Sequence, residues 1–548
     1  MNSEVNGFLR AQGQAIVNGQ GQEVLLRGVG LGSWLLPEGY MWRFPEQGDR
    51  PRKMEHMIRQ LIGEEKAQQF WELYYTRFIT ELDIRQIARE GFNSIRIPLS
   101  YRFLRGTNDT EAYDQRHLEI LDQVLDWCET YSLYAILDLH GAPGGQTGTN
   151  IDDSARDEPE LFTVAENKRR TIELWRMLAA RYRDRWIVAG YDLLNEPLPD
   201  WFSQYYQDVM PLYREIVSAI RDVDPRHMII LEGVHWSTDW SIFTERIDDN
   251  LMLQFHKYWN NPDVESIEQY LAVRETWNVP IFMGEGGENN KLYYTGLFQL
   301  LEDRNISWNF WTWKKLETTN SPCSIRKPEG WGELVHFLEG GEQPDAERAA
   351  GILWDYLDNM LLPNCEYHSD VVRALFRRPS VQIPAVFYDY LGEGVSYGVR
   401  QACWEPAVNF RTKETTRLQF CHGEPRDVNF HHGAGEDWRE DEWLCVVLTA
   451  GDYLTYSFQT TTQARSGLQV AVQVKGGRAE FQLAVDGQPL ETHGIATSSW
   501  QTVTSTITPP LPAGKHQLRV TATDGELSIK WLAIDDRADP HRQIPHNA

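Results

Sequence analysis

Two glutamates interrupt apolar segments of the chain at positions where acid–base chemistry could be done. Glu196 lies near the end of WIVAGYDLLNEP (186–197), and Glu285 lies in VPIFMGEGG (279–287). Hydrolysis of a glycosidic bond needs one carboxylic acid to protonate the leaving oxygen and a second carboxylate across the bond; a separation of about 5–5.5 Å gives a covalent intermediate and retention. Because both acids break an apolar segment at the same level, they predict such a pair rather than two unrelated surface acids.

Further polar and aromatic side chains stand at the ends of other apolar segments. They are Arg96, Asp138, His140, Asn195, His256, Tyr258 and Trp311. Catalytic groups of a parallel barrel lie at the carboxyl ends of its strands, so a ring of polar strand ends indicates a site rather than packing. Trp308, Trp311 and Trp313 are read as alternating residues that share one face, with one or two of them in the barrel core.

Eight apolar segments are expected to be the strands that position these side chains. They are 24–32, 92–100, 133–141, 186–197, 227–234, 251–259, 279–287 and 306–314. Segments with helical period separate most of them, at 64–90, 117–131, 166–184, 201–224, 264–276 and 292–304. Apolar strands alternating with helices predict an α/β fold with a parallel sheet covered on both faces, and eight of them favour a closed (β/α)8 TIM barrel. An open doubly wound sheet is the alternative, but GVGLGSW (28–34) does not fit its phosphate-binding pattern G-x-G-x-x-G.

The pattern along the chain predicts two domains. The barrel domain is expected over 1–395, with a helical insertion around 315–362 that shapes the substrate site. A second domain is expected over 396–548, because residues 400–536 have the pattern of short alternating strands with turn signals that is typical of an all-β jelly-roll sandwich.

Composition narrows the class of ligand. The 548 residues include 53 Lys and Arg against 79 Asp and Glu, a formal charge of −26. Such an acidic chain is a poor match for nucleic acid or an anionic membrane, because both repel it. With 21 Trp, 23 Tyr and 21 Phe, the chain is rich in flat rings that can stack on sugars, which suits a neutral polyhydroxylated ligand.

The cysteines and the N-terminal residues give little further information about function or location. The six cysteines form no C-x-x-C pair, which argues against a zinc or redox motif, although Cys323 and Cys365 flank one helical segment and could pair. No apolar run reaches 18 residues, so no membrane span is expected. MNSEVNGFLRAQGQ (1–14) lacks the features of a signal peptide, so we expect a cytoplasmic protein or a secreted one whose signal has been removed.

Six motifs resemble those of glycoside hydrolase family 5. In chain order they are SIRIPL, DLHGAPG, LLNEP, FHKYW, GEGG and WTWK, and the resemblance covers roughly 24–314. It implies that Glu196 is the acid/base and Glu285 the nucleophile, with no cofactor for catalysis. It further implies that Arg96 orients Glu285 and that Asn195 binds the sugar 2-hydroxyl. The remaining implied sugar-site residues are His140, His256, Tyr258 and, as a stacking floor, Trp311.

Two segments are similar to the exo-β-1,3-glucanase branch of that family. These are RGVGLGSWLLPEGYMW (27–42) and LHGAPGGQTG (139–148), and the resemblance implies that Glu38 lines a pocket for one terminal glucose. We therefore expect exo action on β-glucosides or β-1,3-glucan. An endo-β-glucanase, a β-mannosidase or mannanase, and a glycolipid-cleaving β-glycosidase remain open, and a carbohydrate-binding protein on a barrel scaffold is the non-enzyme alternative.

The C-terminal segment resembles carbohydrate-binding modules of the family 6/35 type. The similar stretches are AGDYLTYSF (450–458), SSWQTV (498–503), LPAGKHQLRV (511–520) and IKWLAI (529–534). The resemblance implies sugar binding through loop aromatics and a structural calcium ion, with a purely structural role as the alternative. The candidate aromatics are Trp438, Trp443 and Trp500.

Overall fold

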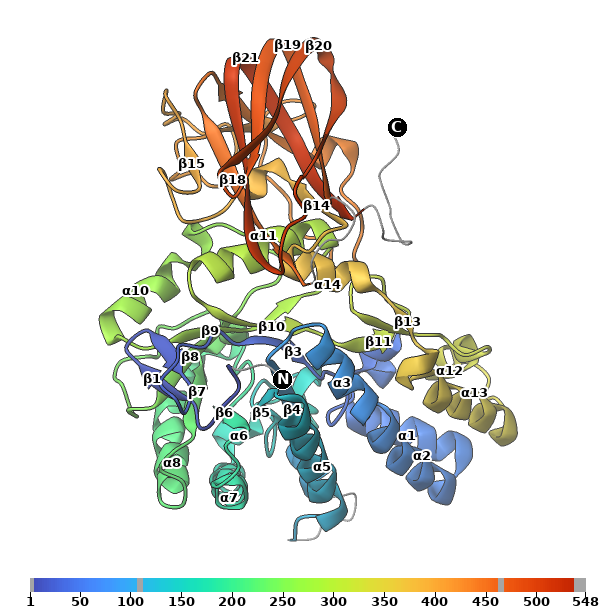
Figure 1. The fold of residues 1–548 in the computed structure, drawn as a ribbon. Coiled ribbons are helices and arrows are strands. Elements are labelled where there is room, and N and C mark those ends of the chain that lie inside the picture. Colours follow the sequence, from blue (N-terminus) through green and yellow to red (C-terminus); the bar gives the residue numbers. More distant parts are fainter. Residues whose placement is uncertain (1–3, 106–111, 462–467, 537–548) are drawn as a thin grey trace. The chain divides into compact units, whose positions relative to one another are not determined.

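The computed structural model describes residues 4–105, 112–461 and 468–536 (Figure 1). The chain divides into two compact units. The first comprises residues up to Lys257, Tyr270–Gly287 and Ile306–Tyr367. The second comprises Tyr258–Gln269, Glu288–Asn305 and the residues from His368 onward. The predicted domain boundary between 395 and 396 stays a prediction, although a strand of the C-terminal sheet already occurs at Val381–Pro384.

The first unit contains a closed barrel of parallel strands in chain order, as predicted. The strands are β3 (Arg27–Gly30), β4 (Ser94–Ser100), β5 (Tyr134–Gly141), β6 (Val188–Asp192), β7 (Met228–Glu232), β8 (Leu251–His256), β9 (Ile281–Gly287) and β10 (Ser307–Trp311). β10 pairs with β3 and closes the barrel, with Trp308 opposite Arg27. Every residue of β4, β5, β8 and β9 is buried, because the strands face the barrel interior on one side and helices on the other.

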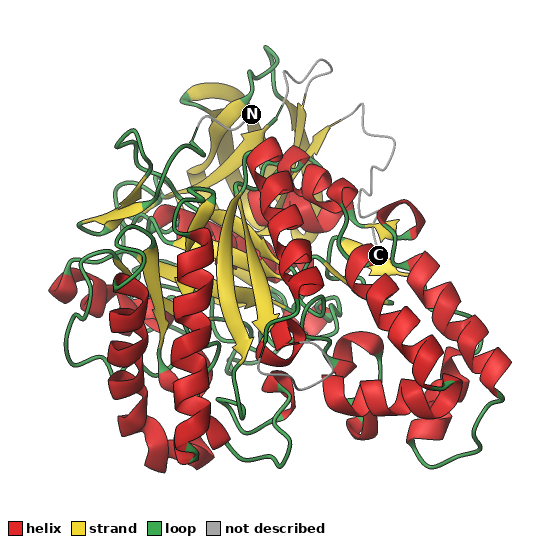
Figure 2. Ribbon diagram, turned by 90° about the horizontal axis from the view of Figure 1, so that it is seen from below, coloured by secondary structure: helices red, strands yellow, loops and turns green. Residues whose placement is uncertain are grey.

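Helices surround the barrel strands (Figure 2). They include α3 (Glu81–Arg89), α5 (Gln115–Tyr131), α7 (Ala165–Tyr182), α8 (Val209–Arg221) and α10 (Glu268–Trp277), with the short helices α4 (Tyr101–Arg105), α6 (Glu160–Thr163) and α9 (Val234–Ser237). The single helix predicted at 64–90 is two helices, because Thr80 and Asp83 form a capping box that starts α3. The segment predicted as one helix at 201–224 begins instead as the 3-10 helix η4 (Asp200–Asp208).

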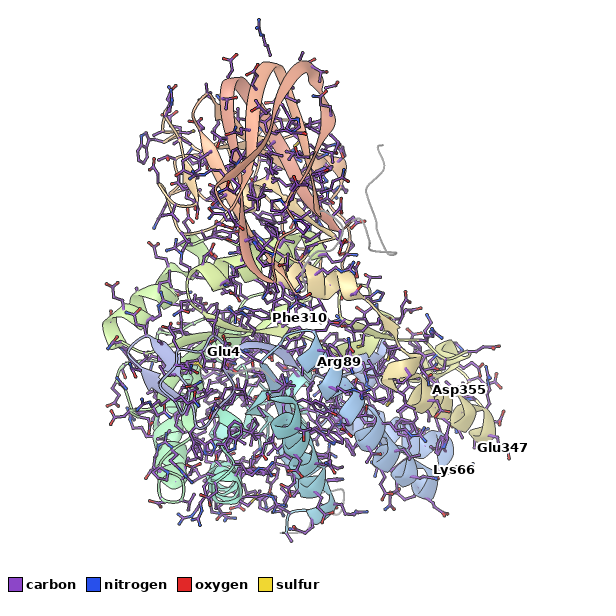
Figure 3. The ribbon with its side chains drawn as sticks, viewed as in Figure 1. Glu4, Lys66, Arg89, Phe310, Glu347 and Asp355 are labelled. Atoms are coloured by element: carbon purple, nitrogen blue, oxygen red, sulfur yellow. The ribbon has the colours of Figure 1, made fainter. Side chains whose placement is uncertain are left out.

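Two further helices of the first unit follow β10 in the chain. They are α12 (Trp331–Leu338) and α13 (Ala346–Asn359), and α13 packs against α1 (Pro51–Ile62) and α2 (Glu64–Arg77). Figure 3 shows the side chains of Glu347 and Asp355 on α13 and of Lys66 on α2. A small sheet of β11 (Lys314–Leu316), β12 (Cys323–Ile325) and β13 (Glu366–Tyr367) flanks these helices.

Cys323 and Cys365 are free thiols, so the disulfide that their positions allowed is not formed. The Cys365 thiol instead donates to the carbonyls of Asn359 and Met360, at 3.5 and 3.6 Å. Burial raises the pKa of both thiols, which keeps them protonated.

The second unit holds the predicted antiparallel β-domain together with α11 (Lys291–Asp303) and α14 (Ser369–Phe376), which pack on each other. Its strands are β14 (Val381–Pro384), β15 (Tyr397–Gly398), β16 (Arg417–Phe420), β17 (Leu444–Thr449), β18 (Tyr453–Thr460), β19 (Leu468–Val485), β20 (Gln488–Thr506) and β21 (Gly514–Asp536). The long strand β21 pairs with β14, β17, β18 and β19, and β19 also pairs with β20. No helix within the described residues is both long and apolar enough to cross a bilayer.

Candidate active site

Arg96 occupies the centre of the site and is fully buried on β4. Its Nη1 donates to Glu285 Oε1 at 2.5 Å, and its Nε donates to Asp192 Oδ2 at 2.8 Å. Its Nη2 lies 3.0 Å from Glu232 Oε1 and 3.2 Å from Asp138 Oδ2. The guanidinium therefore meets carboxylates from β5, β6, β7 and β9, which explains how a charged side chain can be buried inside the barrel.

Three of these acidic side chains, Asp138, Asp192 and Glu232, are not the catalytic candidates but share Arg96 with Glu285. Burial raises the pKa of Asp138 to about 8 and raises that of Asp192 well above its usual range, although Arg96 opposes both shifts. The pKa of Glu232 is lowered, because His256 and Arg96 together outweigh the effect of its burial. Burial thus prevails over Arg96 at the two aspartates, whereas the cationic neighbours prevail over burial at Glu232.

The sequence analysis missed Asp192 and Glu232. Each is the last residue of its strand, whereas Asp138, which the sequence analysis did single out, lies inside β5. The signal was available, because an acid at the end of a buried strand needs a cationic partner.

Glu285 lies on β9 and is almost entirely buried. Its Oε1 accepts from Arg96, and its Oε2 lies 3.6 Å from His256 Nδ1. Burial raises the pKa of Glu285, whereas His256 and Arg96 oppose the shift. Both oxygens of the Glu285 carboxylate thus have a neighbouring basic side chain, and the residue is almost entirely shielded from solvent.

Glu196 is held beside Glu285 by its backbone and by a histidine. It follows β6 in the left-handed region, with φ of 45°, and its backbone N–H donates to Glu232 Oε2 at 2.7 Å. Its Oε1 lies 2.7 Å from His256 Nδ1. One oxygen of Glu196, one oxygen of Glu285 and a ring nitrogen of His256 all lie within 4.8 Å of one another. The site thus brings the two predicted carboxylates together, with the Glu196 side chain more exposed (14%) than that of Glu285 (4%).

The pKa values of the two histidines are shifted in opposite directions. Burial disfavours the cation at His256, yet Glu232 and Glu285 outweigh it and raise its pKa well above the usual range. Burial lowers the pKa of His140 to about 4, so its ring is neutral at neutral pH. His140 Nδ1 lies 2.8 Å from Asp138 Oδ2, and its Nε2 lies 3.4 Å from Asn195 Nδ2.

Asn195 faces the site through its amide. Its Oδ1 accepts from Arg96 Nη2 at 2.8 Å, which leaves the NH2 group on the side of His140. Gln146 donates to the backbone carbonyls of both Asn195 and His140, at 2.9 and 2.8 Å. Asn195 is therefore held by Arg96 at its side-chain oxygen and by Gln146 at its backbone carbonyl.

Trp311, at the end of β10, lies parallel to the ring of His140, with 5.5 Å between centroids and 5° between planes. Its Nε1 donates to the hydroxyl of Tyr40 at 3.0 Å. Glycines at the end of the neighbouring strand β3 and just after it face the indole: a Cβ at Gly30 would be 2.6 Å from Trp311 Cε3, and one at Gly32 would be 2.7 Å from its Cζ2. These glycines create the space for the ring.

The prediction that three tryptophans share one face is wrong. Trp308 contacts Phe92 edge to face at 6.2 Å, and Trp313 Nε1 donates to Asp83 Oδ1 at 3.0 Å, away from Trp311. Residues 308 and 311 differ by an odd number, so a strand of period two directs them to opposite faces.

Glu38 is buried in the loop after β3. Its backbone N–H donates to Ser33 Oγ at 3.2 Å, and Trp42 Nε1 donates to the same oxygen at 3.2 Å. The insertion fixes this loop, because Trp331 Nε1 donates to the Trp42 carbonyl at 3.0 Å. The loop reaches the site through Tyr40, but the contact of Glu38 with a terminal sugar stays a prediction.

Tyr258 begins a segment of the second unit. Its carbonyl accepts from Asn289 Nδ2 at 3.2 Å, and its ring lies 5.6 Å from that of Trp259. Its role in the sugar site stays a prediction.

The aromatics suggested for the C-terminal domain differ in exposure. Trp438 and Trp443 are buried against each other, with centroids 5.2 Å apart, so they are core residues rather than open loop aromatics. Trp500 is half-buried, with the Lys475 ammonium 4.7 Å from its ring centroid.

Groups that could share a cation occur twice among the described residues, both times in the first unit. They are Glu196 with His256 and Glu285, and Asp138 with Asp192 and Glu232. Arg96 already provides positive charge to both groups, so neither has the excess negative charge that a structural divalent ion requires. The structural calcium expected in the C-terminal domain stays a prediction.

A barrel that holds two close carboxylates provides the arrangement that glycoside hydrolysis requires. Residues 56–317, which include the barrel strands from β4 to β10, match the family model of glycosyl hydrolase family 5 (Cellulase). Residues 439–536 match the model of the family 6 carbohydrate-binding module.

Relatives of known name match somewhat less than half of the chain. A β-xylosidase of Phanerodontia chrysosporium is 32% identical over 253 residues, which are 46% of this chain and 52% of the relative. A glucan 1,3-β-glucosidase of Candida oleophila is 32% identical over 252 residues, 43% of this chain and 56% of the relative. The chain thus spans about half the length of the curated relatives it matches. Endoglucanase Cel5A of Thermotoga maritima is similar in structure with a TM-score of 0.40 and 17% identity, covering 64% of this chain and 96% of that one.

The pKa direction of Glu285 predicts the acidic limb of a pH profile. A protonated carboxyl cannot attack, so activity should fall as pH drops through a pKa that lies above that of an ordinary glutamate. We expect kcat/KM for an activated aryl β-glycoside to decline already in mildly acidic buffer. Re-assay at neutral pH after each incubation controls for unfolding. A flat profile down to the range of an ordinary glutamate would contradict the assignment.

Proposed function

We propose that the protein is a retaining β-glycoside hydrolase that removes sugars from the chain end of β-glucosides or β-1,3-glucan. The observation that carries the proposal is the proximity of Glu196 and Glu285, with oxygens within 4.8 Å and His256 between them. This spacing matches double displacement, because an inverting enzyme needs room for a water molecule between its carboxylates.

The contacts assign a role to each side chain. The Glu285 carboxylate attacks the anomeric carbon while Glu196 gives its proton to the leaving oxygen, which forms a glycosyl ester and frees the leaving group. Water then attacks the anomeric carbon, Glu196 takes the water proton, and the bond from that carbon to the Glu285 oxygen breaks, which releases Glu285 as a carboxylate. Arg96 orients Glu285, and the amide of Asn195 is placed to donate to a substrate hydroxyl. Two carboxylates complete this cycle without a cofactor.

Exo action is supported by the way the first loop is fixed. Residues Glu38 to Trp42 are tied to the insertion helices through Trp331, whose ring also stacks on Phe44 at 5.2 Å. A rigid wall at one side of the barrel mouth suits a pocket for a terminal sugar, whereas an endo enzyme needs an open groove. The names of the relatives, glucan 1,3-β-glucosidase and β-xylosidase, support removal of single glucose or xylose units.

Product analysis tests the proposal. A panel of p-nitrophenyl β-glucoside, β-xyloside and β-mannoside identifies the sugar, and NMR of the first product should show the β-anomer. Early digests of laminari-oligosaccharides should contain single sugars or one fixed short product. A spread of lengths at the earliest times would overturn exo action, an α-product would overturn retention, and failure to hydrolyse any panel member or oligosaccharide would favour the non-catalytic alternative.

Glu38 provides a finer test of the pocket. Glu38→Ala should weaken use of the terminal sugar by about 1–3 kcal/mol in kcat/KM if the carboxylate binds a hydroxyl there. An exposed matched variant, Glu347→Ala on α13, should leave the kinetics unchanged. Equal kcat/KM values for Glu38→Ala and the wild type on every substrate would make Glu38 an ordinary loop acid.

A further inference from the structure

Two tryptophans from different loops meet at the edge of the site. Trp201 lies in η4, and Trp236 lies in α9 directly after β7. Their ring centroids are 5.8 Å apart, and the ring planes are inclined by 65°. The Trp201 side chain is 59% exposed, the highest fraction among the exposed large apolar residues described in the first unit. The pair therefore presents an open apolar corner to solvent.

The backbone that carries Trp236 is strained. His235, Trp236 and Ser237 have consecutive φ values of 51°, 58° and 62°, a region that residues with a Cβ seldom adopt. The segment keeps this form because Val234 and Asp239 exchange backbone hydrogen bonds of 2.9 Å, and Ser237 Oγ donates to the Gln254 carbonyl. Strain that is held so firmly points to a functional reason for the position of the indole.

Hydrogen bonds connect this corner to the acid/base candidate. The His235 N–H donates to the Leu198 carbonyl at 2.8 Å, two residues after Glu196. Glu232, at the end of β7, accepts from the Glu196 N–H. The two tryptophans thus follow β6 and β7, the adjacent strands that also hold Glu196 in place.

Phe202 anchors the other side of the corner. A Cβ at Gly148 would lie 2.8 Å from Phe202 Cε2, so the phenyl ring packs directly on the loop after β5. Phe202 also contacts Trp201, with centroids 6.4 Å apart. The platform is therefore supported by three loops at the carboxyl end of the barrel, where substrates bind.

We propose that Trp201 and Trp236 form a binding platform for the leaving-group sugar, one or two units beyond the cleaved bond. The inference rests on the proposed function, because Glu196 must face the leaving oxygen. Apolar ring faces match the CH face of a pyranose, and a sugar held there would also serve as an acceptor. In that transfer, a hydroxyl of the acceptor attacks the glycosyl ester, Glu196 takes its proton, and Glu285 is released.

The experiment compares substrates that reach the platform with one that does not. β-D-glucosyl fluoride has a leaving group too small to touch the tryptophans, whereas laminaritriose extends to them; β-D-xylosyl fluoride and xylotriose replace these if the panel favours xylosides. We expect Trp201→Ala and Trp236→Ala to lower kcat/KM about tenfold on the trisaccharide, with the fluoride unchanged. Transfer from the fluoride to added disaccharide should fall relative to hydrolysis.

Control variants separate stacking from folding. Trp201→Phe keeps a flat ring and should recover most of the trisaccharide activity, and Leu82→Ala removes an exposed apolar side chain on α3 without effect. Equal losses on fluoride and trisaccharide, or none on the trisaccharide, would overturn the platform. Losses confined to p-nitrophenyl glycosides would assign it to aromatic leaving groups and overturn the sugar. If the wild type hydrolyses no fluoride, the proposed function fails instead.

Discussion

Glu285→Gln is expected to remove activity on every glycoside, whatever its leaving group. The amide keeps the shape of the side chain and can still accept from Arg96 Nη1, which now lies 2.5 Å from Oε1. It cannot form the glycosyl ester, so both steps of double displacement are lost. We expect turnover to fall by at least about 10⁴-fold, the upper range for one positioned acid–base group.

Covalent labelling shows whether the Glu285 carboxylate is the nucleophile. A 2-fluoro glycoside with a good leaving group should add one sugar mass to the wild-type protein, and the modified peptide should contain Glu285. Glu347→Gln, an exposed change on α13, should label like the wild type, whereas Glu285→Gln should not label. A label on another residue, or near-normal turnover by Glu285→Gln, would remove Glu285 from the nucleophile's role.

The sequence located the barrel and the carboxylate pair because both follow from simple periodicity. Fully apolar strands need cover on both faces, and a polar residue at a strand end must point to the mouth of the barrel. Glu196 follows β6 and Glu285 lies near the end of β9, whereas Arg96 is the third residue of β4. Their mutual distances depend on the barrel closing, which brings residues 96 and 285 together across 189 positions of sequence.

Other features depended on partners that the sequence does not identify. In the sequence, Asp192 and Glu232 are simply the last residues of apolar strands. Their ion pairs become evident only in the fold, where Arg96 lies beside them. The position of Trp311 depends on Gly30, at the end of β3, and on Gly32 just after it, which approach the indole because β3 pairs with β10. The break before α3 was visible, because Thr80 and Asp83 have the spacing of a capping box.

Glu196→Ala is expected to separate substrates by their leaving groups. Alkyl and sugar leaving groups need protonation, so their turnover should fall by about 10²–10⁴-fold. Activated aryl glycosides need little protonation and should still form the glycosyl ester. The steady-state rate on these aryl glycosides should become limited by hydrolysis of the glycosyl ester, because the attacking water then lacks a base. Azide needs no base, so adding it should speed that step and yield a β-glycosyl azide.

Glu196→Gln offers a stricter comparison, since it keeps a group that can contact His256 Nδ1, now 2.7 Å from Oε1. If Glu196 acts through its proton, Gln and Ala should behave alike on aryl glycosides, and azide should rescue both. If Glu196 only holds His256 in place, Gln should retain activity on sugar leaving groups where Ala does not. Equal losses on aryl and sugar leaving groups, without azide rescue, would refute the acid/base role. Stopped assays on a dinitrophenyl and an alkyl glycoside of the same sugar decide between these outcomes.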